Sequence, residues 1–94
     1  MSDPHESALR ADSRVLLTEL KDGTGLLLHL GTKLYFTLNE TGVLVWKTLV
    51  AGPATRHRLV DVIAERYEAP RETIDADVAA IVEELIGDQL VRPD

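Results

Sequence analysis

The segment 33–46 (KLYFTLNETGVLVW) constrains the fold most, because its apolar period changes from that of a strand to that of a helix. Apolar residues occupy every second position from 34 to 38, as in a strand with one buried face. Asn39 then offers a side-chain oxygen to the free N–H groups of a helix start, and Glu40 places negative charge at the positive end of the helix dipole. Over residues 42–49 the apolar spacing is helical. The segment therefore predicts a strand that leads directly into a capped helix.

Two further strands are predicted before this segment. Residues 14–20 and 26–30 have the length and the apolar content of strands. Between them, residues 21–25 contain an Asp-Gly pair, which tolerates the positive φ angles of tight hairpins. Residues 31–32 (Gly-Thr) form a second turn before the strand at 34–38. Together the three strands predict an antiparallel meander.

The register of the second hairpin stays open at this point. A two-residue loop at 31–32 pairs Leu30 with Lys33, so that Leu28 and Tyr35 share one face and Leu27 and Phe36 share the other. A three-residue loop would instead gather apolar residues on one face (Leu26, Leu28, Leu34 and Phe36). A slip of one residue moves every side chain to the opposite face. We favour the register that buries Phe36 and Leu38, which lead into the helix, without choosing between the loops.

Three helices follow the strands. The first ends near Ala51, before a Gly-Pro pair. The second is capped by Thr55 and carries an apolar stripe over residues 59–67. The third begins at Pro70 and ends near Gly87, with a core stripe along one face (Ile74, Val78, Ile81 and Leu85). The predicted fold is α+β and resembles a winged helix-turn-helix, with a three-stranded meander before three helices.

The chain is long enough for one domain and its hydrophobic core. Residues 1–12 are polar and without a period, so we expect a flexible N-terminal arm followed by a domain over residues 13–94. No apolar run approaches the ~20 residues of a membrane span, and the polar start lacks the pattern of a signal peptide. We therefore expect a cytoplasmic protein that does not bind membranes.

Composition and spacing argue against catalysis and metal binding. The chain has no cysteine, and its three histidines (His5, His29 and His57) do not form the pairs at helical spacing that zinc sites use. The adjacent acids Glu83 and Glu84 point about 100° apart on a helix, so they cannot act as a catalytic pair. No glycine-rich phosphate loop is present. We expect no catalytic residue, no metal and no cofactor.

DNA binding is disfavoured although the predicted fold is one that many DNA-binding proteins use. The last helix of such a motif reads the major groove. Residues 70–88 carry one cation against six acidic residues, a formal charge of −5, and the whole chain carries −6. Phosphates repel such a helix, so we expect no nucleic-acid partner.

Three sequence runs together resemble a known family. They are LLLHLGTKLYFTLNETGVLVWKTL at 26–49, LVDVIAERY at 59–67 and IDADVAAIVEELIGDQLV at 74–91. Their pattern is similar to that of PqqD-like peptide-binding domains, also called RiPP recognition elements, and in particular to the free-standing ones of lasso-peptide gene clusters. The resemblance covers about residues 14–91. Gln89 departs from it, because the family often has glycine there.

The resemblance implies a non-catalytic carrier. Such domains bind the leader region of a ribosomally made precursor peptide and present it to modifying enzymes. In lasso systems these enzymes are a transglutaminase-like leader peptidase and an asparagine-synthetase-like cyclase. The leader is held as an added antiparallel strand on the third strand, against the third helix.

The sequence is compatible with this mode of binding. The third strand of a meander lies at an edge, where its outward N–H and C=O groups can pair with a peptide. The third helix has apolar width beyond its core stripe, which suits the far wall of a groove. The predicted peptide-binding residues are five on the strand and five on the helix (Lys33, Leu34, Tyr35, Phe36, Thr37, Asp75, Val78, Ala79, Val82 and Ile86).

Two alternatives remain beside this interpretation. The chain could be an acidic winged-helix module for protein interaction or regulation, with Arg56 and Arg58 of the second helix as contacts. It could also keep the family but serve the PqqD role in quinone-cofactor biosynthesis, with a radical-SAM partner.

Overall fold

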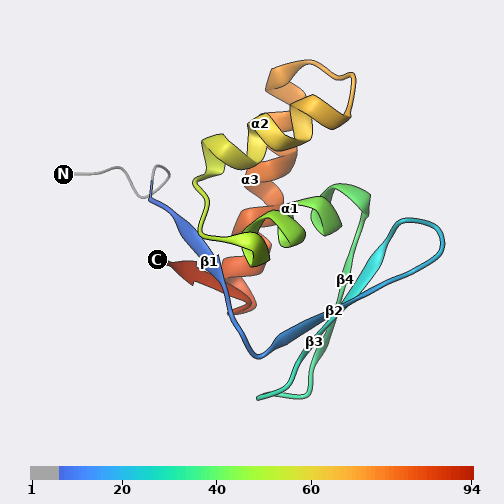
Figure 1. The fold of residues 1–94 in the computed structure, drawn as a ribbon, viewed down its shortest axis with the longest axis vertical. Coiled ribbons are helices and arrows are strands. Elements are labelled where there is room, and N and C mark those ends of the chain that lie inside the picture. Colours follow the sequence, from blue (N-terminus) through green and yellow to red (C-terminus); the bar gives the residue numbers. More distant parts are fainter. Residues whose placement is uncertain (1–6) are drawn as a thin grey trace.

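A computed structural model describes residues 7–94 and confirms the predicted α+β architecture. In chain order the elements are β1 (Leu9–Ala11), β2 (Val15–Glu19), β3 (Gly25–His29), β4 (Tyr35–Leu38), α1 (Glu40–Ala51), α2 (Arg56–Arg66), α3 (Arg71–Gly87) and β5 (Val91–Pro93). Figure 1 shows the three helices grouped together, with the sheet of β2, β3 and β4 extending away from them.

The three-stranded sheet is the predicted meander. Its order is β2-β3-β4, and both pairs are antiparallel. Leu27 lies opposite Phe36 and Leu28 opposite Tyr35, which is the register that a two-residue loop implied. The connection itself is longer than two residues. The His29 N–H donates to the Leu34 carbonyl at 3.0 Å, so the loop contains residues 30–33.

The cause of the longer loop is local. Lys33 adopts a positive φ of 65°, and its N–H donates to the His29 carbonyl at 2.7 Å. Because Lys33 turns back in this way, it cannot form the strand pair with Leu30 that the shorter loop would require. The register still turns Phe36 and Leu38 toward the helices, where both are half-buried.

A second sheet was not expected. β1 pairs with β5 in antiparallel fashion, with Arg10 opposite Arg92, and Figure 1 shows the two strands side by side near the chain ends. Leu9 also exchanges hydrogen bonds with Ala54, at 2.8 and 3.0 Å, and is buried. The flexible arm expected for residues 1–12 is therefore wrong for residues 9–11, whereas residues 1–6 lie outside the described residues.

The helix starts follow the predicted capping chemistry. The Gly42 N–H donates to Asn39 Oδ1 at 2.8 Å at the start of α1. The Arg58 N–H donates to Thr55 Oγ1 at 3.1 Å at the start of α2. Each bond satisfies an N–H that the helix itself leaves free. Pro70 precedes α3 as its cap residue rather than occupying the first helical position.

The core lies around α1, which packs against α2, α3, β1 and β4. Its largest fully buried side chains come from every layer of the fold (Trp46, Leu27, Leu59, Leu90, Val45, Val60 and Val78). Burying each large apolar side chain contributes about 1.5–3 kcal/mol. Leu90 and Val91 are both buried, so the chain folds back onto the core after α3 as expected. Within residues 7–94, no helix combines the length and the apolar content that crossing a membrane requires.

Candidate functional site

The outer edge of β4 is open in the described part of the chain. β4 is the last strand of its sheet and pairs only with β3. In an antiparallel pair, hydrogen-bonded residues alternate with residues whose main-chain groups point away from the partner. Leu34 bonds to His29 of β3, so Phe36 also bonds inward, and the N–H and C=O groups of Tyr35 and Thr37 point outward. These groups can pair with another strand.

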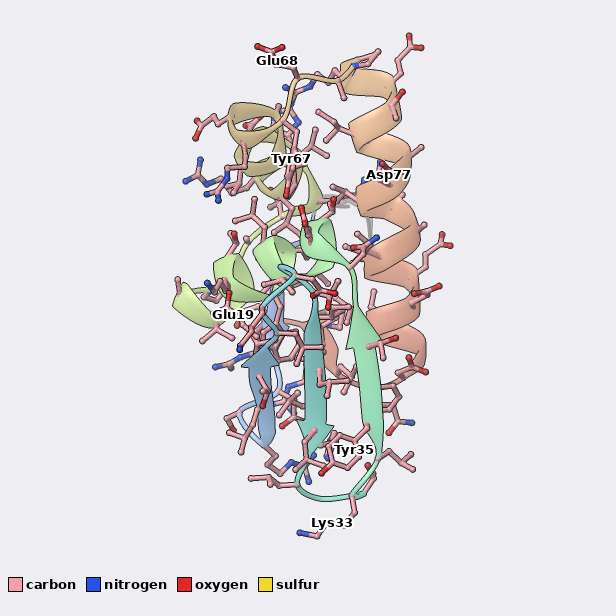
Figure 2. The ribbon with its side chains drawn as sticks, turned by 90° about the vertical axis from the view of Figure 1, so that its right-hand side faces the viewer. Glu19, Lys33, Tyr35, Tyr67, Glu68 and Asp77 are labelled. Atoms are coloured by element: carbon pink, nitrogen blue, oxygen red, sulfur yellow. The ribbon has the colours of Figure 1, made fainter. Side chains whose placement is uncertain are left out.

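A cavity lies between this edge and the second half of α3. Its volume is about 230 Å³. Its walls come from β4, the start of α1, the second half of α3 and the residues that follow α3 (Phe36, Thr37, Leu38, Asn39, Gly42, Ile81, Glu84, Leu85, Asp88 and Leu90). Figure 2 shows β4 as the strand nearest to α3, with Tyr35 and Lys33 at the loop end of the sheet.

The lining of the cavity combines buried apolar side chains with exposed acidic ones. Leu85 and Leu90 are buried, while Ile81 is half-buried. Glu84 and Asp88, one helical turn apart, are both exposed. An apolar side chain fits such a cavity, and the two carboxylates favour a cation beside it.

The five predicted strand residues gather at the open edge. Tyr35 and Leu34 are 67% and 57% exposed. Lys33 and Thr37 are also exposed, Phe36 is half-buried, and both Phe36 and Thr37 line the cavity. Tyr35 continues a cross-strand row with Leu28 of β3 and Leu16 of β2, on the outer face of the sheet.

The five predicted helix residues do not line the cavity beside β4. Val78 and Val82 are buried, with 0% and 7% exposure, so both belong to the core. Ala79, Val82 and Ile86 border a separate, smaller cavity near Leu9 of β1. Asp75 Oδ1 lies 3.8 Å from Nε of Arg56 on α2. The flank of α3 with these residues therefore lies away from the cavity beside β4, contrary to the expectation from the sequence.

The reason is that this flank faces Leu9 of β1 across the smaller cavity instead of facing β4. The core stripe of α3 has one neighbouring flank with Ala79, Val82 and Ile86, and another with Ile81, Glu84 and Asp88. The first borders a cavity that Leu9 of β1 also lines. The second faces β4. The spacing of Ile81, Glu84 and Asp88, three and four residues apart, was visible in the sequence, but the sequence does not say which flank faces the sheet.

A partly buried polar cluster lies at the start of the sheet, with Asp12 and His29 buried and Arg14 exposed. The Arg14 guanidinium donates to both oxygens of Asp12, at 3.2 and 3.0 Å, and the Arg14 N–H donates to Oδ1 at 2.8 Å. These bonds hold the pKa of the Asp12 carboxyl well below its usual value. His29 Nε2 lies 3.8 Å from Asp12 Oδ2. In residues 7–94 no three His, Asp or Glu side chains gather in a way that could hold a metal ion.

Solved structures with this fold include peptide-binding proteins. "TbiB1 in Complex with the TbiA(beta) Leader Peptide" is 28% identical, with a TM-score of 0.76 over 88% of this chain and 94% of that one. "Lasso peptide synthetase B1 complexed with the leader peptide" is 24% identical, with a TM-score of 0.73 over 90% of this chain and 98% of that one. A search of curated proteins gave no match.

The PqqD truncation of Methylobacterium extorquens PqqCD, described as a functional and stand-alone RiPP recognition element, is 23% identical. It has a TM-score of 0.72 over 90% of this chain and 88% of that one. The model of the family described as "Coenzyme PQQ synthesis protein D (PqqD)" matches residues 24–91, well over half of the chain. This chain therefore belongs to the PqqD family.

Proposed function

We propose that this protein binds the leader region of a ribosomally made precursor peptide. The observation that carries the proposal is the open edge of β4 beside a cavity on α3. Family membership supports it, as do the two similar structures that contain a leader peptide. An open edge beside a cavity that can take alternate side chains is the arrangement that peptide recognition by strand addition requires.

In the proposed mode, the leader adds an antiparallel strand to β4. Its main chain pairs with the outward groups of Tyr35 and Thr37, and Lys33 and Leu34 contact it near the loop. Alternate side chains of an added strand point to opposite faces. One set then enters the cavity against Ile81, and the other set extends the outer face of the sheet. Glu84 and Asp88 favour a leader with a basic residue beside the cavity.

We further propose that binding serves delivery. The chain acts as a non-catalytic carrier that presents its precursor to a transglutaminase-like leader peptidase and an asparagine-synthetase-like cyclase. This division of labour is that of lasso-peptide maturation. Ribosomes make the precursor in the cytoplasm, which is therefore the proposed place of action.

Calorimetric titration with the leader peptide encoded beside this gene tests the proposal. Tyr35→Pro removes the outward N–H, so it should weaken binding by at least about tenfold, or 1.4 kcal/mol. Tyr35→Ala keeps that N–H and serves as the matched control, because it removes only the side chain. Phe36→Pro should instead damage the sheet, since its N–H bonds to β3.

Circular dichroism on each variant separates loss of binding from loss of folding. A folded Tyr35→Pro protein that binds as tightly as the parent would show that the leader does not pair with this edge. Absence of binding by the parent protein would contradict the proposal that it recognises a leader peptide.

A second candidate keeps the same site but changes the pathway. The matching family takes its description from coenzyme PQQ synthesis, and one similar structure is a PqqD domain. In that role the peptide would be the quinone-cofactor precursor, and the enzyme partner a radical-SAM protein. Parallel titrations with a lasso leader and a quinone-cofactor precursor separate the two, because the matched peptide should bind at least about tenfold more tightly.

A further inference from the structure

His29 is a buried titratable residue that the proposed binding mode does not use. It lies at the end of β3 and is 4% exposed. Its Nδ1 accepts the N–H of Gly31 at 3.0 Å and the N–H of Thr32 at 3.2 Å. A ring nitrogen that accepts hydrogen bonds carries no proton, so the imidazole is neutral, with its hydrogen on Nε2.

The imidazole therefore supports the loop that leads into β4. The loop contains residues 30–33. The two N–H groups that donate to the ring belong to Gly31 and Thr32, in the middle of the loop. The ring also packs tightly against Gly31, where an added Cβ would lie only 2.9 Å from His29 Cε1. β4 begins two residues after this loop. The position of the loop thus helps to set the position of the open edge.

The charged groups recorded beside the ring, among residues 7–94, are Asp12 and Arg14. Asp12 Oδ2 lies 3.8 Å from Nε2, and Arg14 Nη1 approaches Gly31 from the same side. Hydrogen bonds from Arg14 lower the pKa of Asp12, so its carboxylate stays ionised above pH 5. That carboxylate would accommodate an imidazolium. A protonated Nδ1, however, can no longer accept the two loop N–H groups.

We propose that His29 is a positioning residue for the peptide-binding edge. Its unprotonated Nδ1 holds the loop, and with it the start of β4, in the form that accepts a peptide strand. Protonation of Nδ1 releases the loop and weakens peptide binding. This inference rests on the proposed function of the β4 edge.

Two substitutions separate the acceptor from the rest of the side chain. Asparagine accepts hydrogen bonds from N–H groups two and three residues further along, and it does not titrate. His29→Asn should therefore keep the loop and bind the leader independently of protonation at this position. His29→Leu has a similar volume but no acceptor, so it should bind weakly at every pH.

The experiment compares leader affinity at about pH 7.5 and about pH 5, the range in which histidine changes charge. The parent should lose at least about threefold in affinity relative to His29→Asn between these values. His5, His57 and the titrating groups of the leader are common to both titrations, so their effects cancel in the comparison. Equal pH profiles for the two proteins would overturn the inference, as would tight binding by a folded His29→Leu variant.

A measurement without the leader distinguishes this inference from the proposed function. In NMR spectra of the free parent protein, the amide signals of Gly31 and Thr32 should shift with the same midpoint as the His29 ring nitrogens. These shifts should be absent in His29→Asn. If the amides do not follow the ring, His29 does not control the loop. If they do follow it but the parent does not bind a leader, the proposed function fails instead.

Discussion

At the scale of single residues, the neighbours Ile81 and Val82 of α3 have different roles, one at the proposed binding site and one in the core. Consecutive residues of a helix point about 100° apart. Val82 accordingly points into the core, with 7% exposure, while Ile81 is half-buried and lines the cavity beside β4. Periodicity in the sequence placed Ile81 on the core stripe and Val82 beside it, on the flank expected to bind the peptide. It could not assign their roles, because these depend on distant segments of the chain, with β4 beside Ile81 and Leu9 across a cavity from Val82.

This geometry predicts that Val82→Glu destabilises the fold rather than binding alone. An unpaired carboxylate in the core should lower the free energy of unfolding by about 3 kcal/mol or more. Urea denaturation measures this value. Ala80→Glu is the matched control, since Ala80 lies exposed on the same helix. A Val82→Glu protein as stable as the Ala80→Glu protein would place Val82 outside the core.

Asp12 should make stability depend on pH in the acid range. Its pKa is lowered in the folded protein, first by the side-chain hydrogen bonds from Arg14 and then by the Arg14 backbone N–H. Folded-state stabilisation is therefore present above the unfolded pKa, about 3.9, and is lost as the pH falls further. At neutral pH, Asp12→Asn should cost about 1–2 kcal/mol.

Thermal melts of both proteins between about pH 7 and pH 3 check this prediction. The gap in melting temperature between parent and Asp12→Asn should narrow as the pH drops below about 4. A gap that stays constant down to pH 3 would mean that the Asp12 carboxylate is not stabilised by folding. Arg14 needs no correction here, because its guanidinium stays charged throughout.

At the scale of elements, the sequence predicted correctly those helix starts that depend on nearby residues. The period change at Asn39 and the cap at Thr55 depend on residues within a few positions, and both helix starts were correct. β1 was missed because it depends on a partner strand that is distant in the sequence. Three residues are too few to show a period, and the partner strand, β5, lies near residue 92. Only pairing between the two ends of the domain turns residues 9–11 into a strand.

The alternation of main-chain groups along β4 predicts a specific pattern of amide protection. Without a peptide, the amides of Tyr35 and Thr37 should exchange quickly with solvent, because they point away from β3. That of Phe36 should be protected in both states. Leader binding should slow exchange at Tyr35 and Thr37 by at least about tenfold. Hydrogen exchange followed by NMR resolves these three amides.

Phe36 provides the internal control for that measurement. A uniform change across all three amides would indicate general stabilisation on binding rather than strand addition. Unchanged exchange at Tyr35 and Thr37 with bound leader would exclude pairing at this edge.

At the scale of the whole molecule, the sheet extends from the helices while the edge of β4 stays beside the second half of the acidic helix α3 (Figure 2). Figure 1 shows β2, β3 and β4 extending away from the helices. The acids of α3 at positions 72, 77 and 83 are exposed. The fold class could be expected from three strands followed by three helices and from the family pattern. The side of α3 that faces the sheet could not be predicted from the sequence, because it depends on how distant segments pack.

This charge distribution predicts that the protein does not bind duplex DNA at physiological salt. Residues 70–88, which include the helix that would enter a groove, carry a formal charge of −5. Affinity for DNA depends strongly on cations that neutralise phosphates, and this helix offers only Arg71. In a gel-shift assay, sub-micromolar protein should therefore leave the DNA unshifted.

A charge-reversed variant tests whether the negative charge of α3 is the reason that the protein does not bind DNA. Replacing Glu72, Asp77 and Glu83 by lysine changes exposed positions only, and it turns the formal charge of residues 70–88 from negative to positive. The variant should bind DNA weakly, with an affinity that falls steeply as salt is raised. The parent should stay unbound under the same conditions. A salt-sensitive shift with the parent itself would contradict the prediction, because it would require a cationic surface that outweighs α3.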